Sequence, residues 1–177
     1  VVGLEVMQDF VYAEKRDNPV LIMAGGFGKR LLPLTQDTPK PLLKVGSKPV
    51  LESIVEQLVA AGLEQLFVAV HYKADLIRSH FGNGRTWGAN ITYLEESQPL
   101  GTAGALALLE PQCLKSPLLV MNGDLLTNLD FRQLLDFHEA REAQATICVR
   151  EYDFQIPYGV VEGDRGQVLR LTEKPKK

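Results

Sequence analysis

Short apolar runs alternate along the chain with segments in which apolar residues recur every three or four positions. Residues 19–24 are continuously apolar and stop at two glycines, which is the pattern of a strand buried on both faces. Residues 49–61 carry apolar side chains at intervals of four, which predicts an amphipathic helix. The same criteria predict further strands at residues 66–70, 91–94, 118–121 and 145–149, further helices at 74–81, 102–109 and 130–143, and a hairpin of residues 159–162 and 168–172.

This alternation of strands and helices is typical of an α/β fold. We therefore expect a Rossmann-like, doubly wound and mostly parallel sheet with helices on both faces, formed by residues 19–177. Residues 1–18 are of mixed character and are predicted to be a tail or linker. The chain ends on Lys-Pro-Lys-Lys without a closing element, so we also expect the domain to be truncated at its C-terminus.

The connection between the first strand and the first long helix, residues 25–48, is the part that indicates chemistry. It is long for such a connection, and long loops of this kind are usually functional. It carries five basic residues and one acidic residue, a local charge of +4 in a chain of net charge −3. Such a loop at the carboxyl end of a strand predicts an anion site. Its glycines let backbone N–H groups approach a phosphate closely, and Arg30 and Lys40 supply positive charge.

Two familiar phosphate motifs do not fit this loop. A P-loop requires Lys followed by Ser or Thr after its last glycine, whereas Gly28 is followed by Lys29 and Arg30. A dinucleotide fingerprint requires a third glycine where this chain has Leu31. These departures argue against a nicotinamide-dependent oxidoreductase, although that class stays among the alternatives.

The composition excludes other classes. A net charge of −3 gives no overall basic field, so we expect no nucleic-acid partner. Apolar runs are too short for a membrane span, and the N-terminus has no signal-peptide pattern, so we expect no membrane partner and a cytoplasmic location. Cys113 and Cys148 lack metal-ligand spacing and are predicted to be reduced cysteines.

The loop also carries a recognisable sequence. Gly25-Gly-Phe-Gly-Lys-Arg-Leu-Leu-Pro-Leu-Thr35, followed by Pro39-Lys-Pro-Leu42, resembles the signature of sugar-nucleotide pyrophosphorylases, which are sugar-1-phosphate nucleotidyltransferases. Further matching blocks follow in order: Pro99-Leu-Gly-Thr-Ala-Gly104, Asn122-Gly-Asp124, Tyr158-Gly-Val-Val-Glu162 and Glu173-Lys-Pro175. The resemblance covers residues 19–177 and is closest to guanylyltransferase-like members that follow a pair of cystathionine-β-synthase-type (CBS) domains. Residues 1–5 look like the final strand of such a module, and an arbitrary tail is the alternative.

The resemblance implies a reaction and roles for residues. The enzyme would transfer a nucleoside monophosphate from a triphosphate to a sugar 1-phosphate and release pyrophosphate, with Mg²⁺ as cofactor. The implied residues are Arg30, Lys40 and Asp124 for catalysis, Asp124 also for the metal, Gly25, Gly26, Gly28, Lys29, Glu96 and Gly101 for the nucleotide, and Gly159, Glu173 and Lys174 for the sugar phosphate. Lys29 departs from the family pattern, which has a threonine there. The family also continues beyond residues 173–175 with a second metal-binding aspartate.

Glu96 aligns with the position that reads the base. Guanine presents two neighbouring N–H donors, which one carboxylate can accept together, so GTP is the favoured substrate. A catalytically weak homologue that binds nucleotide as a regulatory module is the alternative function. His71 ends a predicted strand, and a loop histidine is favoured there over a pocket-lining one. Whether the protein is a homo-oligomer stays open.

Overall fold

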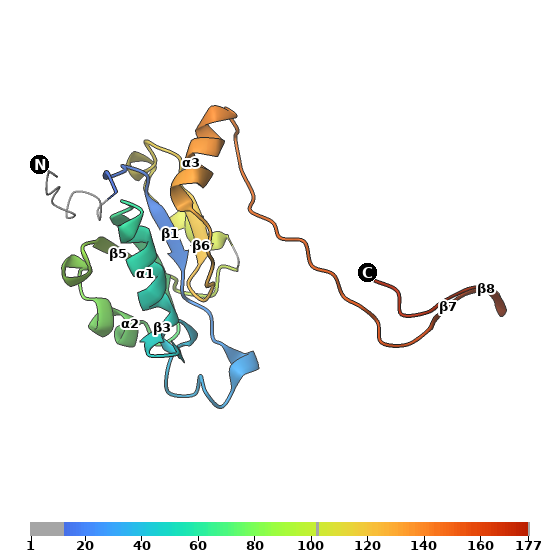
Figure 1. Cartoon of the computed structure of the whole chain (residues 1–177). Helices are drawn as coiled ribbons and strands as arrows, with labels where there is room; N and C mark the ends of the chain where they lie inside the picture. Colours follow the sequence, from blue (N-terminus) through green and yellow to red (C-terminus); the bar gives the residue numbers. More distant parts are fainter. Residues whose placement is uncertain (1–12, 102, 177) are drawn as a thin grey trace, which may run out of the picture. The chain divides into compact units, whose positions relative to one another are not determined.

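The computed structural model describes residues 13–101 and 103–176. The chain forms two compact units, Val1–Ala140 and Arg141–Lys177, which are described one at a time (Figure 1). The predicted boundary at residue 18 is not tested by this division, and residues 1–5, predicted as the end of a CBS module, lie outside the described part.

A four-stranded parallel sheet forms the centre of the first unit (Figure 1). Its strand order is β5-β4-β1-β6, so β1 lies between β4 and β6. The strands are β1 (Val20–Met23), β4 (Gln65–Val70), β5 (Asn90–Glu95) and β6 (Leu119–Asn122). Because β1 pairs on both edges and is covered on both faces, all of its positions favour apolar side chains, which explains its continuous apolar run. The predicted Rossmann-like sheet is confirmed.

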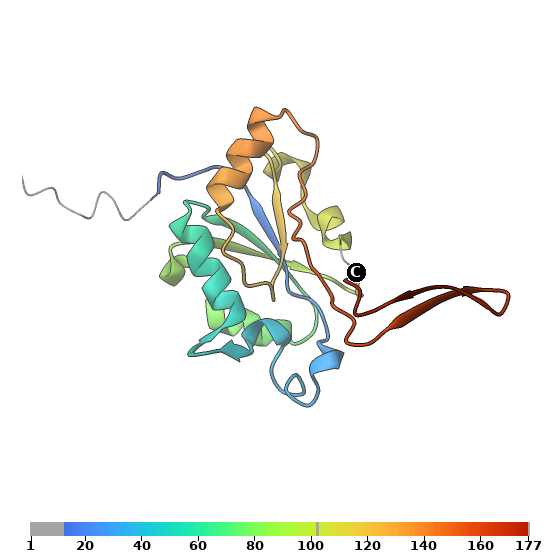
Figure 2. The same cartoon turned by 45° about the vertical axis from the view of Figure 1, so that its right-hand side comes forward.

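The two faces of the sheet are covered differently (Figure 2). Val20 and Ile22 of β1 belong to the larger apolar core, which includes buried residues of α1 (Val50–Ala60), α2 (Ala74–Phe81) and α3 (Phe131–Ala140). Leu21 points the other way and packs with Ala105 and Leu109. The predicted helix at residues 102–109 is therefore present on this second face, but as the 3-10 helix η5 (Gly104–Leu108).

Short elements connect these strands and helices. The long loop after β1 folds into two 3-10 helices and a two-stranded antiparallel hairpin. These and the remaining short helices are η2 (Lys29–Leu31), η3 (Lys40–Leu42), β2 (Lys44–Val45), β3 (Lys48–Pro49), η4 (Arg85–Trp87) and η6 (Pro111–Cys113). None of the helices within residues 13–101 and 103–176 has the length and apolar character needed to span a membrane.

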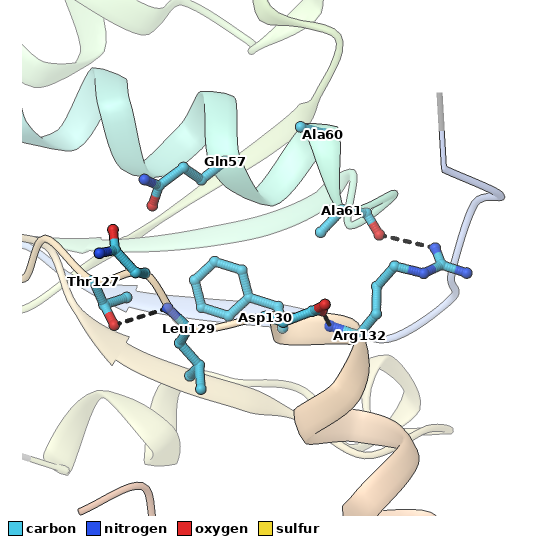
Figure 3. Close-up of a pocket in the computed structure, with 9 residues that line it drawn as sticks. Gln57, Ala60, Ala61, Thr127, Leu129, Asp130 and Arg132 are labelled. Carbon is cyan, nitrogen blue, oxygen red and sulfur yellow. Dashed lines mark hydrogen bonds between the residues drawn. The ribbon is translucent and has the colours of Figure 1, made fainter. Parts of the chain in front are cut away.

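The start of α3 is held by side chains that also line a cavity of about 490 Å³ (Figure 3). The Asp130 carboxylate accepts hydrogen bonds from the backbone N–H groups of Arg132 and Gln133 and thereby caps the helix. The Arg132 guanidinium donates to the carbonyl oxygens of Glu14 and Ala61 at 2.8 and 3.1 Å. Both charged side chains are thus engaged in hydrogen bonds with backbone groups. We therefore assign this cavity a structural role, where α1, α3 and the segment before β1 meet.

The second unit contains the predicted hairpin, formed by β7 (Val160–Asp164) and β8 (Gln167–Thr172). The predicted strand at residues 145–149 is wrong, because these residues form no strand. Ile147 and Val149 are 81% and 88% exposed. A strand requires a neighbouring chain to pair with its backbone groups, and none pairs with this segment in the second unit.

Candidate functional site

A cavity of about 500 Å³ lies at the carboxyl ends of the central strands. This is the position at which open parallel sheets bind ligands, and β1, where the strand order reverses, ends at it. The cavity is lined by Met23, Ala24, Gly25, Gly26, Phe27, Arg30, Lys40, Pro41, Glu96, Pro99, Gly101, Asn122 and Asp124. Seven of the predicted site residues are among them.

The loop after β1 is folded back on itself around Gly28 and Thr35. The Thr35 hydroxyl donates to the Gly28 carbonyl oxygen at 2.9 Å, and Thr35 is fully buried. Gly28 adopts a left-handed conformation with φ of 63°. A Cβ atom at this position would lie 2.7 Å from the Thr35 Cγ2 atom and 3.4 Å from the Lys40 Cβ atom. The absence of a side chain at Gly28 therefore helps to set where Lys40 stands.

Gly28→Ala is expected to lower the free energy of unfolding by about 2 kcal/mol or more, since it combines the left-handed backbone cost of about 1–2 kcal/mol with a steric clash. Gly46→Ala is the matched control, because Gly46 has φ of 69° and nothing near its Cβ position. Urea denaturation of both variants separates the two contributions. Equal losses in the two variants would show that contact with Thr35 has no energetic role.

Only two of the loop's five basic side chains line the cavity, namely Arg30 and Lys40. The Lys48 ammonium contacts the Glu56 carboxylate at 2.7 Å, and this hydrogen bond raises the pKa of Lys48. The Lys29 ammonium lies 5.4 Å from the centre of the Phe27 ring. Lys44 is exposed in β2. The loop with a charge of +4 borders the cavity, but only two of its five cations line it, so the charge count overstates how many could reach a ligand there.

Lys40 and Asp124 form an ion pair inside the cavity. Asp124 follows β6 directly after Gly123, and Lys40 begins η3. The two side chains are 40% and 32% exposed, so both are accessible to a ligand. The two residues chosen from the sequence as catalytic cation and metal ligand therefore touch one another.

The residues around Asp124 fit a Mg²⁺ ion that is held jointly by the protein and a bound phosphate. Within the described residues, no three His, Cys, Asp or Glu side chains come together at a point that could hold a metal ion. Mg²⁺ in nucleotide sites is commonly held by one or two carboxylates together with phosphate oxygens and water. Asp124 thus fits a metal ion that arrives with a triphosphate, and Asn122 also lines the cavity.

Glu96 follows β5 and is one of the few buried polar residues, with 8% of its surface exposed. One of its carboxylate oxygens accepts the backbone N–H of Leu100 at 3.0 Å. The other, Oε1, would lie 3.3 Å from a Cβ atom at Gly25, so a larger residue at position 25 would crowd it. The carboxylate is therefore held in a defined place in the cavity wall.

The remaining predicted residues are placed less directly. Gly28 and Lys29 do not line the cavity, although Gly28 shapes the loop that does. Gly159, Glu173 and Lys174 lie in the second unit, where a Cβ atom at Gly159 would be 3.1 Å from a Glu173 carboxylate oxygen. The sequence reasoning missed Phe27, Pro41 and Met23 as lining residues. Phe27 lies between Gly26 and Gly28, and its place within this glycine-rich segment could have indicated that it lines the site.

Comparison with known proteins gives a consistent result. The family model described as "Nucleotidyl transferase" matches residues 19–177. A mannose-1-phosphate guanyltransferase of Candida albicans is 39% identical over 161 residues, which cover 88% of this chain and 44% of that protein. The mannose-1-phosphate guanylyltransferase catalytic subunit beta of Danio rerio is also 39% identical, with coverages of 88% and 45%. The chain thus spans under half the length of these curated relatives.

Solved structures agree on the fold. HddC from Yersinia pseudotuberculosis, in complex with GMP-PN, superposes with a TM-score of 0.61 at 26% identity over 89% of this chain and 69% of that one. A UDP-glucose pyrophosphorylase in complex with UDP-glucose superposes with a TM-score of 0.59 at 19% identity, with the same coverages. With the family model matching nearly the whole chain, the protein belongs to the nucleotidyl transferase family.

Proposed function

We propose that the protein transfers a nucleoside monophosphate, with GTP as the preferred donor, to a sugar 1-phosphate and releases pyrophosphate. The observation that carries this proposal is a single cavity containing two cations, an accessible carboxylate and a buried carboxylate at the ends of parallel strands. Because the curated relatives include mannose-1-phosphate guanyltransferases, mannose 1-phosphate is the first acceptor to test.

In the proposed reaction, an oxygen of the sugar phosphate attacks the α-phosphorus of the triphosphate. The bond between that phosphorus and the bridging oxygen of the β-phosphate breaks, and pyrophosphate leaves in line. Both reactants are anionic, so the site must neutralise charge and align groups, with no covalent intermediate. Arg30 would bind the departing pyrophosphate, and Lys40 would stabilise charge at the α-phosphate. A magnesium ion held by Asp124 would add positive charge at the phosphates.

The other residues would bind the two substrates. Gly25, Gly26 and Gly28 would let the backbone approach the triphosphate, with Lys29 adding charge outside the cavity, and Gly101 would lie against the base. The sugar phosphate would be bound by the Glu173 carboxylate, the Lys174 ammonium and the exposed backbone at Gly159. A cytoplasmic location belongs to the same proposal, which the free Cys113 and Cys148 support.

The base is proposed to be read by Glu96. Its carboxylate can accept the N1 and N2 donors of guanine together, whereas uracil, thymine and adenine offer no such pair of adjacent donors. A site built around a hydrogen-bond acceptor also discriminates strongly, because the buried group is left unpaired by the wrong ligand. The burial of Glu96 in the cavity wall supports this role.

A thermal-shift panel with Mg²⁺ and each of GTP, UTP, dTTP, CTP and ATP tests the proposal. GTP at about 100 times its Kd should add about 2.7 kcal/mol of stability. Glu96→Gln is expected to weaken GTP binding by roughly 10- to 100-fold, because a hydrogen bond to a charged group contributes about 1.5–3 kcal/mol. Glu95→Gln is the matched control, since the neighbouring Glu95 carboxylate is exposed and pairs with Arg78.

Turnover completes the test. Pyrophosphate release from GTP should require a sugar 1-phosphate, and mannose 1-phosphate is compared with glucose 1-phosphate. Stabilisation by GTP without any pyrophosphate release would favour a regulatory nucleotide-binding module. Absence of a shift with every triphosphate would contradict the proposed function.

A further inference from the structure

Glu96 is held not only through its carboxylate but also through its backbone. The Nδ1 atom of His71 lies 2.6 Å from the Glu96 carbonyl oxygen. The Glu96 N–H in turn donates to the Val70 carbonyl oxygen at 2.9 Å. Glu96 therefore makes three hydrogen bonds, and the third is the one that its carboxylate accepts from the Leu100 N–H. Two of these hydrogen bonds come from the end of β4.

The chemistry of the contact defines the state of the imidazole. A carbonyl oxygen only accepts hydrogen bonds, so Nδ1 of His71 must carry the proton and donate it. If β4 and β5 continued as a parallel pair, the backbone N–H of Tyr72 would donate to the Glu96 carbonyl oxygen. Here the N–H of Tyr72 turns instead to the Gly25 carbonyl oxygen on β1's side, at 3.5 Å. The His71 imidazole therefore takes the place of a backbone hydrogen bond between the strands β4 and β5.

The position of the imidazole is itself fixed by the loop after β1. The Phe27 ring meets the His71 ring edge-on, with centroids 5.3 Å apart and planes at 86°. Gly25 also lies close to this histidine, because a Cβ atom at position 25 would be 3.2 Å from the His71 Cβ atom. Phe27 and Gly25 both line the cavity, whereas His71 is not among its lining residues. His71 therefore contacts Glu96, the residue proposed to bind the base, without lining the cavity itself.

We propose that His71 is a positioning residue for base selection, which acts by holding the backbone of Glu96 so that its carboxylate meets guanine. This inference rests on the proposed function, because it needs Glu96 to read the base. It assigns to His71 a role in choosing the nucleotide and no role in the transfer step. Loss of the imidazole donor should therefore change the preference among nucleotides.

The test measures Kd for GTP and for ATP, with Mg²⁺, in the wild type and in His71 variants. His71→Ala is expected to lower the ratio of GTP to ATP affinity about five- to ten-fold, the change that losing one hydrogen bond typically gives. His71→Leu repeats this with the volume largely retained. His71→Asn can place an amide N–H near the former Nδ1 position, so its ratio should stay within about two-fold of the wild type.

The matched control is His80→Ala, which removes a histidine of α2 that pairs with Glu52 of α1 and does not line the cavity. A wild type that prefers GTP, together with an unchanged ratio in His71→Ala and His71→Leu, would overturn the role of His71 alone. An equal fall in His71→Asn would also overturn it, because the donor would then not be the cause. A wild type that binds ATP as tightly as GTP, or neither, would contradict the proposed function itself.

Discussion

Lys40→Ala is expected to lower kcat by about 10²- to 10³-fold, the loss that follows removal of one preorganised donor from a transition state that gathers negative charge. The structure supplies the reason for choosing this lysine over the four other basic residues of its loop. Lys40 lines the cavity and touches Asp124, whereas Lys44 is exposed in β2. Pyrophosphate release under saturating GTP and sugar 1-phosphate gives kcat directly.

Lys44→Ala is the control for Lys40→Ala, because it removes the same charge from the same loop outside the cavity. Its kcat should remain within about two-fold of the wild type. The thermal stability of Lys40→Ala should change little, since the ion pair is partly exposed and such pairs contribute about 0–1 kcal/mol. A kcat for Lys40→Ala equal to that of Lys44→Ala would remove Lys40 from the proposed mechanism.

Asp124→Asn is expected to remove most of the Mg²⁺-dependent activity, a loss of about 10²-fold or more, because a metal-held charge contributes several kcal/mol to such transition states. The substitution keeps the size of the side chain and removes its charge. A second readout does not depend on turnover. Mn²⁺ binding in the presence of GTP, followed by electron paramagnetic resonance, should weaken in parallel with activity.

Asp136→Asn is the control for Asp124→Asn, since Asp136 lies on α3 and pairs with Arg16. It should bind Mn²⁺ and GTP as the wild type does. Unchanged Mn²⁺ binding in Asp124→Asn would show that the metal is held by other ligands. Because Lys40 pairs with Asp124, the substitution also frees the ammonium, and GTP alone should still bind to Asp124→Asn through Arg30 and Lys40.

Local sequence pattern predicted the elements that lie in the core. The helix expected at residues 49–61 is found as Val50–Ala60, and the strand at 19–24 as Val20–Met23. The repeat of apolar residues in the helix and the continuous apolar run of the strand both follow from burial. The strand predicted at residues 145–149 failed because a strand is defined by its partner, and apolar alternation does not reveal whether a partner is adjacent. Residues 102–109 show the same limit, since their composition does not distinguish an α-helix from η5.

In the candidate site, Glu96 and Asp124 were named from the family resemblance, and the fold explains why they share a cavity with Gly25. These residues follow strands, and parallel strands end at one edge, so the topology brings Gly25, Glu96 and Asp124 to one cavity. The pairing of Lys40 with Asp124 could not be predicted, since it depends on how the loop folds around Gly28 and Thr35. The contact of His71 with Glu96 joins residues 25 positions apart. No local pattern carries that information.

The order of the strands also sets a length along the site. Glu96 follows β5, and Asp124 follows β6, with β4 and β1 between them. Neighbouring strands lie about 4.8 Å apart, so the strand ends from which Glu96 and Asp124 extend are about 14 Å apart. The Glu96 carboxylate reaches part of this way back, because its Oε1 atom lies close to Gly25 after β1. A ligand that reaches both has to lie across the strand ends, perpendicular to the strands. Under the proposed function, the strand order would place the base on the β5 side of the phosphates, and the distance between these strand ends would set how far a bound nucleotide has to extend.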